Sequence, residues 1–299
     1  MIIPEWVRKN VVFVAYRMAS GEMRFLGSAF FLGRAPEGYT RGLGPASGLR
    51  LVTARHLLDY VRKRGLAHIF VRVNNKNGEA VWIISEISDW KYHPTDPAVD
   101  LAMVPFGILS DWDHIAVPSV SGFTPALALE HEVALGEEVF IVGLFRHHRG
   151  QKRNIPIVRV GNLAALDEEK VQTAEGPIDA YLIEARSLGG LSGSPVFLNL
   201  GTVRQIKGRV VGADTGGGGP IIILLGLIHG HYDTPAPTID SDADEGLTPE
   251  RINTGIAIVV PAQKIMEAFD ANSPATAQPV PLALRYFADA ELADPNLVL

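Results

Sequence analysis

Apolar residues come in short runs along this chain, and turn residues separate the runs. The runs are rich in Val, Ile and Phe, and Gly, Pro and Asn stand between them. Short runs of this composition between such turn residues are typical of β-strands. Twelve strands are therefore predicted, over residues 11–16, 24–32, 49–53, 68–73, 80–87, 100–105, 138–145, 155–160, 180–185, 195–200, 221–228 and 255–260.

The spacing of these runs divides the chain into two halves. Six predicted strands come before residues 107–131 and six come after them. This count is typical of two similar antiparallel β-barrels or sandwiches joined by a linker. The predicted fold is all-β, with a first six-stranded barrel in residues 1–115, a second in 116–270, and a C-terminal tail in 271–299.

Helical periodicity is scarce by comparison. Residues 56–64 predict one short helix. Residues 261–270 predict a second, because Pro stands at the start and Ile265, Met266 and Phe269 fall on one face.

Composition narrows the class of protein. The chain has 299 residues, of which 47% are hydrophobic and 20% charged, which is enough for one large core or two small ones. There is no cysteine, which excludes disulfides, thiolate metal sites and a cysteine nucleophile. The net charge is −6, and six acidic residues lie within residues 233–250, so that the remaining acids equal the 27 bases. This balance does not favour nucleic acid as a partner.

No segment reads as a signal or a membrane span. The N-terminal residues lack a basic stretch followed by a long apolar run, and no apolar run approaches 18 residues. We therefore expect a cytoplasmic protein without membrane contact. The basic stretch 146–154 and the acidic stretch 232–253 are most simply solvated loops. Neither a cofactor nor a metal is expected, since the neighbouring His147 and His148 would not share one face of a strand.

A glycine-rich turn in residues 189–197 is the first candidate for chemistry. Its sequence is Gly-Gly-Leu-Ser-Gly-Ser-Pro-Val-Phe, which predicts a tight turn followed by a buried strand. Such a turn can expose the Ser192 hydroxyl while backbone N–H groups converge beside it, as acyl transfer requires. The alternative is an ordinary hairpin turn.

A serine nucleophile needs a base and a group that orients the base. His56 follows an apolar run, and Asp100 precedes another, where a partly buried carboxylate would need a strong donor. Taken singly, the histidine could start a helix and the aspartate could cap a turn. Taken with Ser192, they occur in the order His, Asp, Ser, each at the end of a predicted strand.

These segments resemble the chymotrypsin-fold, trypsin-like serine proteases. The resemblance rests on residues 27–31, 53–56, 99–102, 190–195 and 226–230, and it covers roughly residues 10 to 270. Within that family the chain is similar to the cysteine-free bacterial branch of high-temperature-requirement and glutamyl-endopeptidase-like enzymes. Residues 135–139, 193–197 and 253–261 support this placement, and no segment of PDZ size follows.

The resemblance implies a serine endopeptidase that acts on a protein or peptide. Ser192 would be the nucleophile, His56 the general base and then acid, and Asp100 the group that orients the histidine. The backbone N–H groups of Gly190 and Ser192 would form the oxyanion hole. Leu191 stands where digestive enzymes have the aspartate that pairs with a new N-terminus, so activation by zymogen cleavage is not expected. A loop or a regulatory protein partner would set the turn instead.

The same resemblance suggests the substrate-binding residues. Arg186 and Ser187 fall where the family has the base of its primary pocket, and His229, Gly230 and His231 fall on the strand that pairs with substrate. A guanidinium with histidines would suit an acidic residue before the cleaved bond. The alternative is that Arg186 pairs with a nearby acid such as Glu184 and that the histidines are surface residues.

Two other functions remain open. The first is a binding module of the same fold, with a silent or partner-gated site that recognises peptides or a partner protein. The second is an α/β-hydrolase with Asp214 and His229 following Ser192, although the helices of that fold are missing from the pattern. The sequence gives no oligomeric state.

Overall fold

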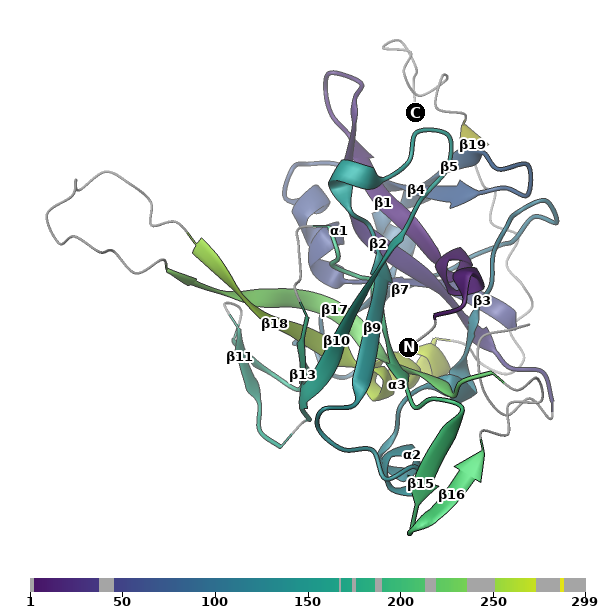
Figure 1. Ribbon diagram of the computed structural model, residues 1–299. Coiled ribbons are helices and arrows are strands. Elements are labelled where there is room, and N and C mark those ends of the chain that lie inside the picture. Colours follow the sequence, from purple (N-terminus) through teal and green to yellow (C-terminus); the bar gives the residue numbers. More distant parts are fainter. Residues whose placement is uncertain are drawn as a thin grey trace, which may run out of the picture.

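The computed structural model describes residues 3–37, 46–166, 168–173, 176–185, 190–212, 219–235, 251–272 and 286–287. Its strands form two main sheets, one from each half of the chain (Figure 1).

The strands of the N-terminal half, together with β19 from the C-terminal segment, form one nine-stranded sheet. Eight of its strands follow the order β19-β5-β4-β1-β2-β3-β7-β6, and β8 pairs with β2. Their bounds are β1 Val11–Arg17, β2 Met23–Arg34, β3 Ser47–Thr53, β4 His68–Asn74, β5 Ala80–Glu86, β6 Lys91–Tyr92, β7 Ala102–Pro105, β8 Val117–Pro118 and β19 Tyr286–Phe287. The central pair, β1 and β2, runs antiparallel with Val11 opposite Phe30.

The C-terminal half closes into a six-stranded barrel. Its strands follow the order β10-β13-β18-β17-β14-β9 around the ring. Their bounds are β9 Glu138–Gly143, β10 Ile157–Ala165, β13 Tyr181–Glu184, β14 Pro195–Asn199, β17 Ile222–Pro235 and β18 Arg251–Pro261. Because the barrel is closed, each of its strands pairs with a neighbouring strand on both sides, and the sheet has no edge strand.

The remaining elements are short. Two hairpins project from the barrel, formed by β11 Val171–Thr173 with β12 Gly176–Ile178 and by β15 Val203–Ile206 with β16 Arg209–Gly212. The helices are α1 Arg55–Arg62, α2 Pro125–Glu130 and α3 Ala262–Ala271, and the 3₁₀ turns are η1 Glu5–Asn10, η2 Ile87–Asp89, η3 Ser119–Ser121 and η4 Arg146–His148.

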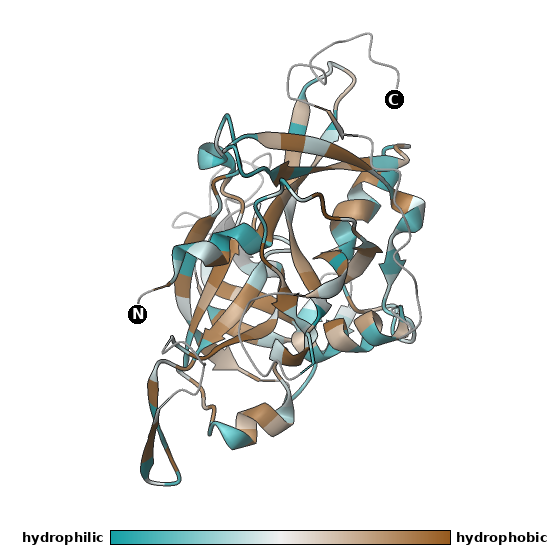
Figure 2. Ribbon diagram, turned by 90° about the vertical axis from the view of Figure 1, so that its right-hand side faces the viewer, coloured by the Kyte–Doolittle hydropathy of each residue, from teal (hydrophilic) through white to brown (hydrophobic). Residues whose placement is uncertain are grey.

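A continuous apolar core fills both halves. The buried side chains form one large cluster that includes residues of the N-terminal sheet and of the barrel. In the barrel, the Phe140 and Phe197 rings stack at a centroid distance of 5.2 Å. Figure 2 shows hydrophobic residues following the strands of both halves, with hydrophilic residues at the loops. Full burial of each large apolar side chain stabilises the fold by about 1.5–3 kcal/mol.

Helix α3, near the C-terminal end of the described chain, makes side-chain contacts with the N-terminal half. At its end, Asn272 accepts a hydrogen bond of 3.2 Å through its carbonyl from Arg50 of β3. In its middle, Glu267 lies 3.2 Å from the ring of the buried His93. The two halves therefore share side-chain contacts as well as a core.

The predicted all-β fold class is confirmed. All twelve predicted strands occur, and six of them form the closed barrel. Within the described residues, the strands of the N-terminal half form an open path rather than a second complete ring. Both predicted helices occur within one or two residues of their expected bounds, as α1 and α3. The C-terminal segment contributes Tyr286–Phe287 to the edge of the first sheet, opposite β5.

Candidate active site

His56 lies in the first turn of α1, directly after β3. Helix α1 begins at Arg55, and its cap residue Ala54 offers no side-chain acceptor. The acceptor comes from elsewhere, because the Asp100 Oδ1 atom accepts the backbone N–H of His56 at 2.8 Å. A carboxylate at a helix N-terminus satisfies a free donor and is favoured by the helix dipole by about 0.3–1 kcal/mol. Asp100 thus fixes the backbone of the histidine.

Asp100 also fixes the ring of that histidine. The Nδ1 atom of His56 lies 2.7 Å from Asp100 Oδ2. The Asp100 side chain is 9% exposed, whereas the His56 side chain is 42% exposed. The Nδ1 edge of the ring is therefore held against the acid, while much of the rest of the side chain is exposed to solvent.

A second histidine reaches the same carboxylate oxygen. The Nδ1 atom of His229, on β17, lies 2.6 Å from Asp100 Oδ2. The two imidazole rings meet edge to face, with centroids 5.7 Å apart. An ionised carboxylate only accepts hydrogen bonds, so both Nδ1 atoms carry their protons. This leaves the Nε2 atom of each neutral ring as an acceptor.

The charge of Asp100 follows from these contacts. Burial alone would raise the pKa of the carboxyl, but the hydrogen bonds from His229 and His56 and the electrostatic attraction of these two residues outweigh burial, so that the pKa lies well below its usual range. Asp100 is therefore ionised at neutral pH. A lone buried carboxylate would cost several kcal/mol, and its three N–H donors offset that cost.

Ser192 lies in a turn that the surrounding backbone holds in place. Ser192 accepts through its carbonyl from the N–H of Ser28, at 2.9 Å. The next residue, Gly193, donates to the carbonyl of Ile228 at 2.8 Å, and Ile228 donates in turn to Ser194 at 2.9 Å. The turn is thereby fastened to β2 on one side and to β17, next to His229, on the other.

Glycines allow this turn to lie against the segment that carries His56. Gly193 has φ +77°, and a Cβ atom there would lie 2.2 Å from the Ser28 carbonyl oxygen and 2.4 Å from Thr53 Oγ1. Thr53 ends β3, three residues before His56. Only glycine permits both the backbone conformation and the close approach. The packing brings the Ser192 turn to the β3–α1 junction.

The residue before the serine is set by packing. Leu191 is 1% exposed and belongs to the main core. Gly190 has φ +112°, and its Cα faces the Leu144 carbonyl and the Arg146 side chain, which would lie 3.2 and 3.3 Å from an added Cβ. The segment after β9 therefore lies directly against the turn.

The structure places His56 in contact with Asp100, and the backbone of the Ser192 turn lies against the β3–α1 junction. Arg186 and Ser187 lie outside the described residues. Gly230 and His231 lie on β17, opposite Ile258 and Ala257 of β18.

Sequence reasoning missed the contact of His229 with Asp100. It placed His229 among the substrate-binding residues, whereas the Nδ1 atom of this residue faces the acid. The two residues are 129 positions apart, and no local pattern joins them. The one available signal was the position of His229 within the 226–230 segment that carries the resemblance.

The two histidines and Asp100 could also be considered as metal ligands. Their ligand atoms lie within 4.8 Å of one another. Two ligands of one tetrahedral zinc ion lie roughly 3.3 Å apart, because each stands about 2.0–2.2 Å from the metal. The separations of 2.6 and 2.7 Å between Nδ1 and Oδ2 are shorter than that and fit hydrogen bonds. The residues as placed form a hydrogen-bonded cluster.

A two-part β-fold with a buried aspartate on a histidine, and a glycine–serine turn packed beside them, defines the class of chymotrypsin-fold serine proteases. Residues 27–206 match the trypsin-like peptidase domain family, and the chain belongs to that family. No curated protein matches the sequence closely enough to count as a relative.

Solved structures of similar fold include other proteases. The MamO protease domain from Magnetospirillum magneticum, in its apo form, matches with a TM-score of 0.47 and 18% identity, over 87% of this chain and 96% of that one. The inactive form of the Rv3671c protease from M. tuberculosis matches at 0.44 and 16%, over 90% of each chain. Deg5 matches with a TM-score of 0.42 and 16% identity, over 75% of this chain and 80% of that one.

A helix that spans a membrane needs a long and continuous apolar stretch. In the part of the chain that the structure describes, none of the helices is long and apolar enough to cross a membrane.

Proposed function

We propose that this trypsin-like protease hydrolyses peptide bonds through His56, Asp100 and Ser192. The observation that supports it best is the double contact of Asp100 with the backbone N–H and the Nδ1 atom of His56. With Nδ1 protonated, Nε2 is the ring nitrogen that can accept a proton, as a general base must.

The proposed reaction has two steps. The His56 Nε2 atom accepts the Ser192 hydroxyl proton while the serine oxygen attacks the peptide carbonyl carbon. The same ring then gives that proton to the leaving amine, and an acyl-enzyme remains on Ser192. Water, deprotonated by His56, releases the acid product and restores the serine. The N–H groups of Gly190 and Ser192 would stabilise the oxyanion in both steps.

His229 is a positioning residue in this proposal. Its Nδ1 proton occupies the second lone-pair region of Asp100 Oδ2. The carboxylate is then held from the barrel side by His229 and from the α1 side by His56. Because the acid cannot rotate freely, the imidazole of His56 keeps one tautomer and one orientation.

The proposed oxyanion turn is set by the fold itself rather than by an inserted N-terminus. Leu191 is anchored in the core, and Gly190 lies against Leu144 and Arg146. These contacts can hold the turn without the ion pair that Leu191 cannot make. A regulatory partner would act by shifting the segment after β9.

We also propose that the enzyme prefers substrates with an acidic residue immediately before the cleaved bond. Support comes from the sequence position of Arg186 and from His231 on β17. Beyond Leu227, β17 pairs with β18 but, among the described strands, has no ladder partner on its other side. An extended substrate can add there as a strand. Since His229 Nδ1 is engaged with Asp100, only its Nε2 side remains for a substrate.

Digestion of a peptide library, with the products identified by mass spectrometry, tests the proposal. The wild type should cleave after Asp or Glu, and Ser192→Ala should not cleave. Ser194→Ala is the matched control, because that serine is two positions away with a buried side chain. Cleavage that survives in Ser192→Ala would contradict the assignment of the nucleophile. An unchanged acidic preference in Arg186→Ala would contradict the specificity alone.

A further inference from the structure

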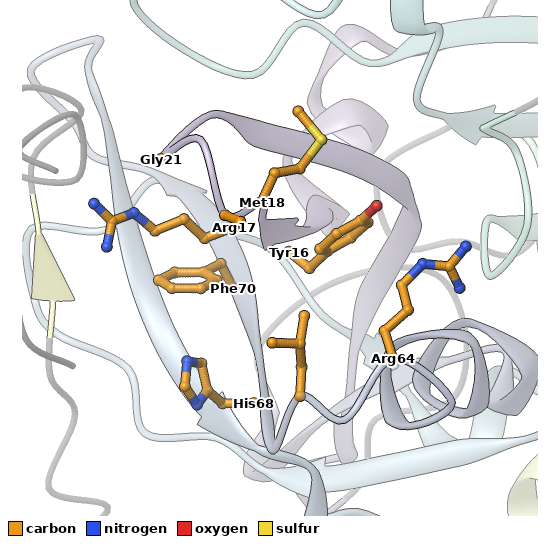
Figure 3. A pocket seen from close by; sticks show the side chains of 9 residues that line it. Tyr16, Arg17, Met18, Gly21, Arg64, His68 and Phe70 are labelled. Atoms are coloured by element: carbon orange, nitrogen blue, oxygen red, sulfur yellow. The ribbon is translucent and has the colours of Figure 1, made fainter.

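Two cavities near the end of the β1–β2 hairpin are lined by basic and aromatic side chains. The first has a volume of about 610 Å³, and its lining includes Tyr16, Arg17, Arg64, His68 and Phe70. In Figure 3, the Arg17 and Arg64 side chains lie on opposite sides of the hollow, with the Tyr16 and Phe70 rings between them. Among the residues that the structure describes, no acidic side chain lines this cavity. The cavity therefore has aromatic side chains at its centre and arginine side chains on two sides.

The second cavity has a volume of about 760 Å³. Its lining includes Phe25, Trp82, Arg72, Arg146 and Arg149, together with two histidines of η4. Of the described residues that line it, Glu22 alone is acidic. Its composition therefore repeats that of the first cavity, with aromatic side chains beside guanidinium groups.

The two cavities share their supporting elements. The hairpin residues up to Gly21 line the first cavity, and those from Glu22 onwards line the second. Along β4, His68 and Phe70 line the first cavity and Arg72 lines the second. These alternate residues of one strand point to the same face. We call the surface formed by Arg17, Arg64, His68, Arg146 and Arg149 the basic track. Arg72 is not counted in it, because Arg72 is 2% exposed and its guanidinium donates to the carbonyls of Gly150 and Gln151.

Contacts within the fold hold several of these cations in place. The Arg64 guanidinium lies 3.4 Å from the centroid of the Tyr60 ring, and that of Arg149 lies 4.9 Å from the Phe25 ring. Arg146 donates to the Leu26 carbonyl at 3.1 Å. Such groups lose less side-chain entropy on binding an anion than free surface arginines do. The chain as a whole carries −6, so this concentration of positive charge contrasts with the rest of the molecule.

The basic track borders the Ser192 turn on the side away from β17. Arg146 lies against Gly190, as described above, and Phe25 is two residues before Gly27 on β2. At Gly27, an added Cβ would lie 2.5 Å from the Ser192 carbonyl oxygen. If the acyl side of a substrate runs along β17, the leaving side passes over β2 toward the second cavity.

We propose that the basic track binds an acidic segment of the polypeptide substrate, on the C-terminal side of the cleaved bond. This inference rests on the proposed function for the direction of the substrate. Guanidinium groups bind carboxylates through charge-assisted hydrogen bonds. A nucleic acid fits less well, because Arg149 and Arg72 already cover the Phe25 and Trp82 rings on which bases would stack.

Matched peptides test this inference. They share the residues up to the cleaved bond and differ only in the following six residues, which are rich in Glu or in Gln. The Glu peptide should have a kcat/KM about tenfold higher through a lower KM, and the advantage should shrink between 50 and 300 mM salt. Arg64→Gln and Arg149→Gln should each reduce the advantage by about threefold and leave the Gln peptide unchanged. Arg209→Gln, on the β15–β16 hairpin, should change neither.

A binding measurement separates this inference from the proposed function. The fluorescently labelled Glu segment alone should bind Ser192→Ala, as fluorescence anisotropy reports, and the Gln segment should not. If the Glu segment binds but the wild type cleaves no peptide, the proposed function is wrong, whereas the inference about the basic track is supported. Equal cleavage of both peptides without binding of the Glu segment would overturn the inference. Equally tight binding of a single-stranded oligonucleotide would overturn the choice of a polypeptide.

Discussion

The two halves of the molecule supply the candidate site in different ways. The N-terminal sheet supplies His56 and Asp100, which stand beyond strand ends and are fixed by hydrogen bonds to side-chain atoms. The C-terminal barrel supplies Ser192, which is fixed by backbone hydrogen bonds and by glycines that permit close packing. Chemistry in the first half therefore depends on side-chain identity. In the second half, the Ser192 turn depends on its backbone conformation and on the small volume of its glycines, while His229 contributes through its side chain.

The largest effect should come from the acid of the first half. Asp100→Asn keeps the shape of the side chain, but its amide group replaces an acceptor of N–H donors with a donor. The His56 ring would then favour the other tautomer, and kcat should fall by about 10⁴. Peptide hydrolysis at neutral pH measures this. A rate within tenfold of the wild type would show that Asp100 does not orient the base.

The second half should respond most strongly to added volume. Gly193→Ala combines an unfavourable φ of +77° with contacts of 2.2 and 2.4 Å. The free energy of unfolding should fall by about 3 kcal/mol or more. Gly208→Ala is a matched control, because its φ is +73° and nothing lies within 4 Å of an added Cβ. It should cost only about 1–2 kcal/mol. Equal losses in urea unfolding would contradict the packing account of the turn.

His229 tests whether the two halves cooperate at Asp100. His229→Phe keeps a ring but removes the donor, so kcat should fall about tenfold with little change in KM. The acid limb of the pH–rate profile should move to higher pH, because the carboxylate charge is then shared with His56 alone. His229→Gln retains an N–H donor and should recover part of the loss. A lower rate with an unmoved profile and no rescue would reduce His229 to a packing role.

The smallest effect should appear in the pH dependence of stability. The pKa of Asp100 is lowered in the folded state, so its stabilising contribution is complete above the unfolded value of about 3.9. This contribution is lost as the pH falls below that value toward the folded pKa. The difference in unfolding free energy between the wild type and Asp100→Asn should therefore shrink between pH 5 and pH 2. A constant difference would show that Asp100 gains nothing from its histidine partners.

Much of the architecture could be predicted from apolar runs, because most of the long strands bury a stretch of Val, Ile and Phe. Strand β10 is an exception, since only Leu163 is buried in it. The short elements were not predicted, because so few residues give no clear apolar pattern. The β15–β16 hairpin exposes Val210, and β8 is only two residues long. Helix α2 did carry a local signal, since Thr124 precedes Pro125 and its hydroxyl accepts from the N–H of Leu127. That pattern of cap and first-turn proline marks a helix start.

The candidate site likewise has features that local sequence predicts and features that depend on tertiary packing. His56, Asp100 and Ser192 could be proposed from local sequence, because each stands at a strand end in a recognisable segment. The contact of His229 with Asp100 depends on how β17 passes the β3–α1 junction, and the basic track depends on how the segment after β9 lies over β2. Both arise from the packing of distant segments, which no local spacing encodes.

The most direct test of the central claim is labelling with a fluorophosphonate, followed by mass-spectrometric mapping of the modified residue. The probe forms a covalent bond only with a serine oxygen activated by a working base. The account predicts one adduct, on Ser192, which is absent in Ser192→Ala, retained in Ser194→Ala and greatly slowed in Asp100→Asn. A folded wild-type protein that forms no adduct, or forms it on another residue, would contradict the assignment of this site as the catalytic centre.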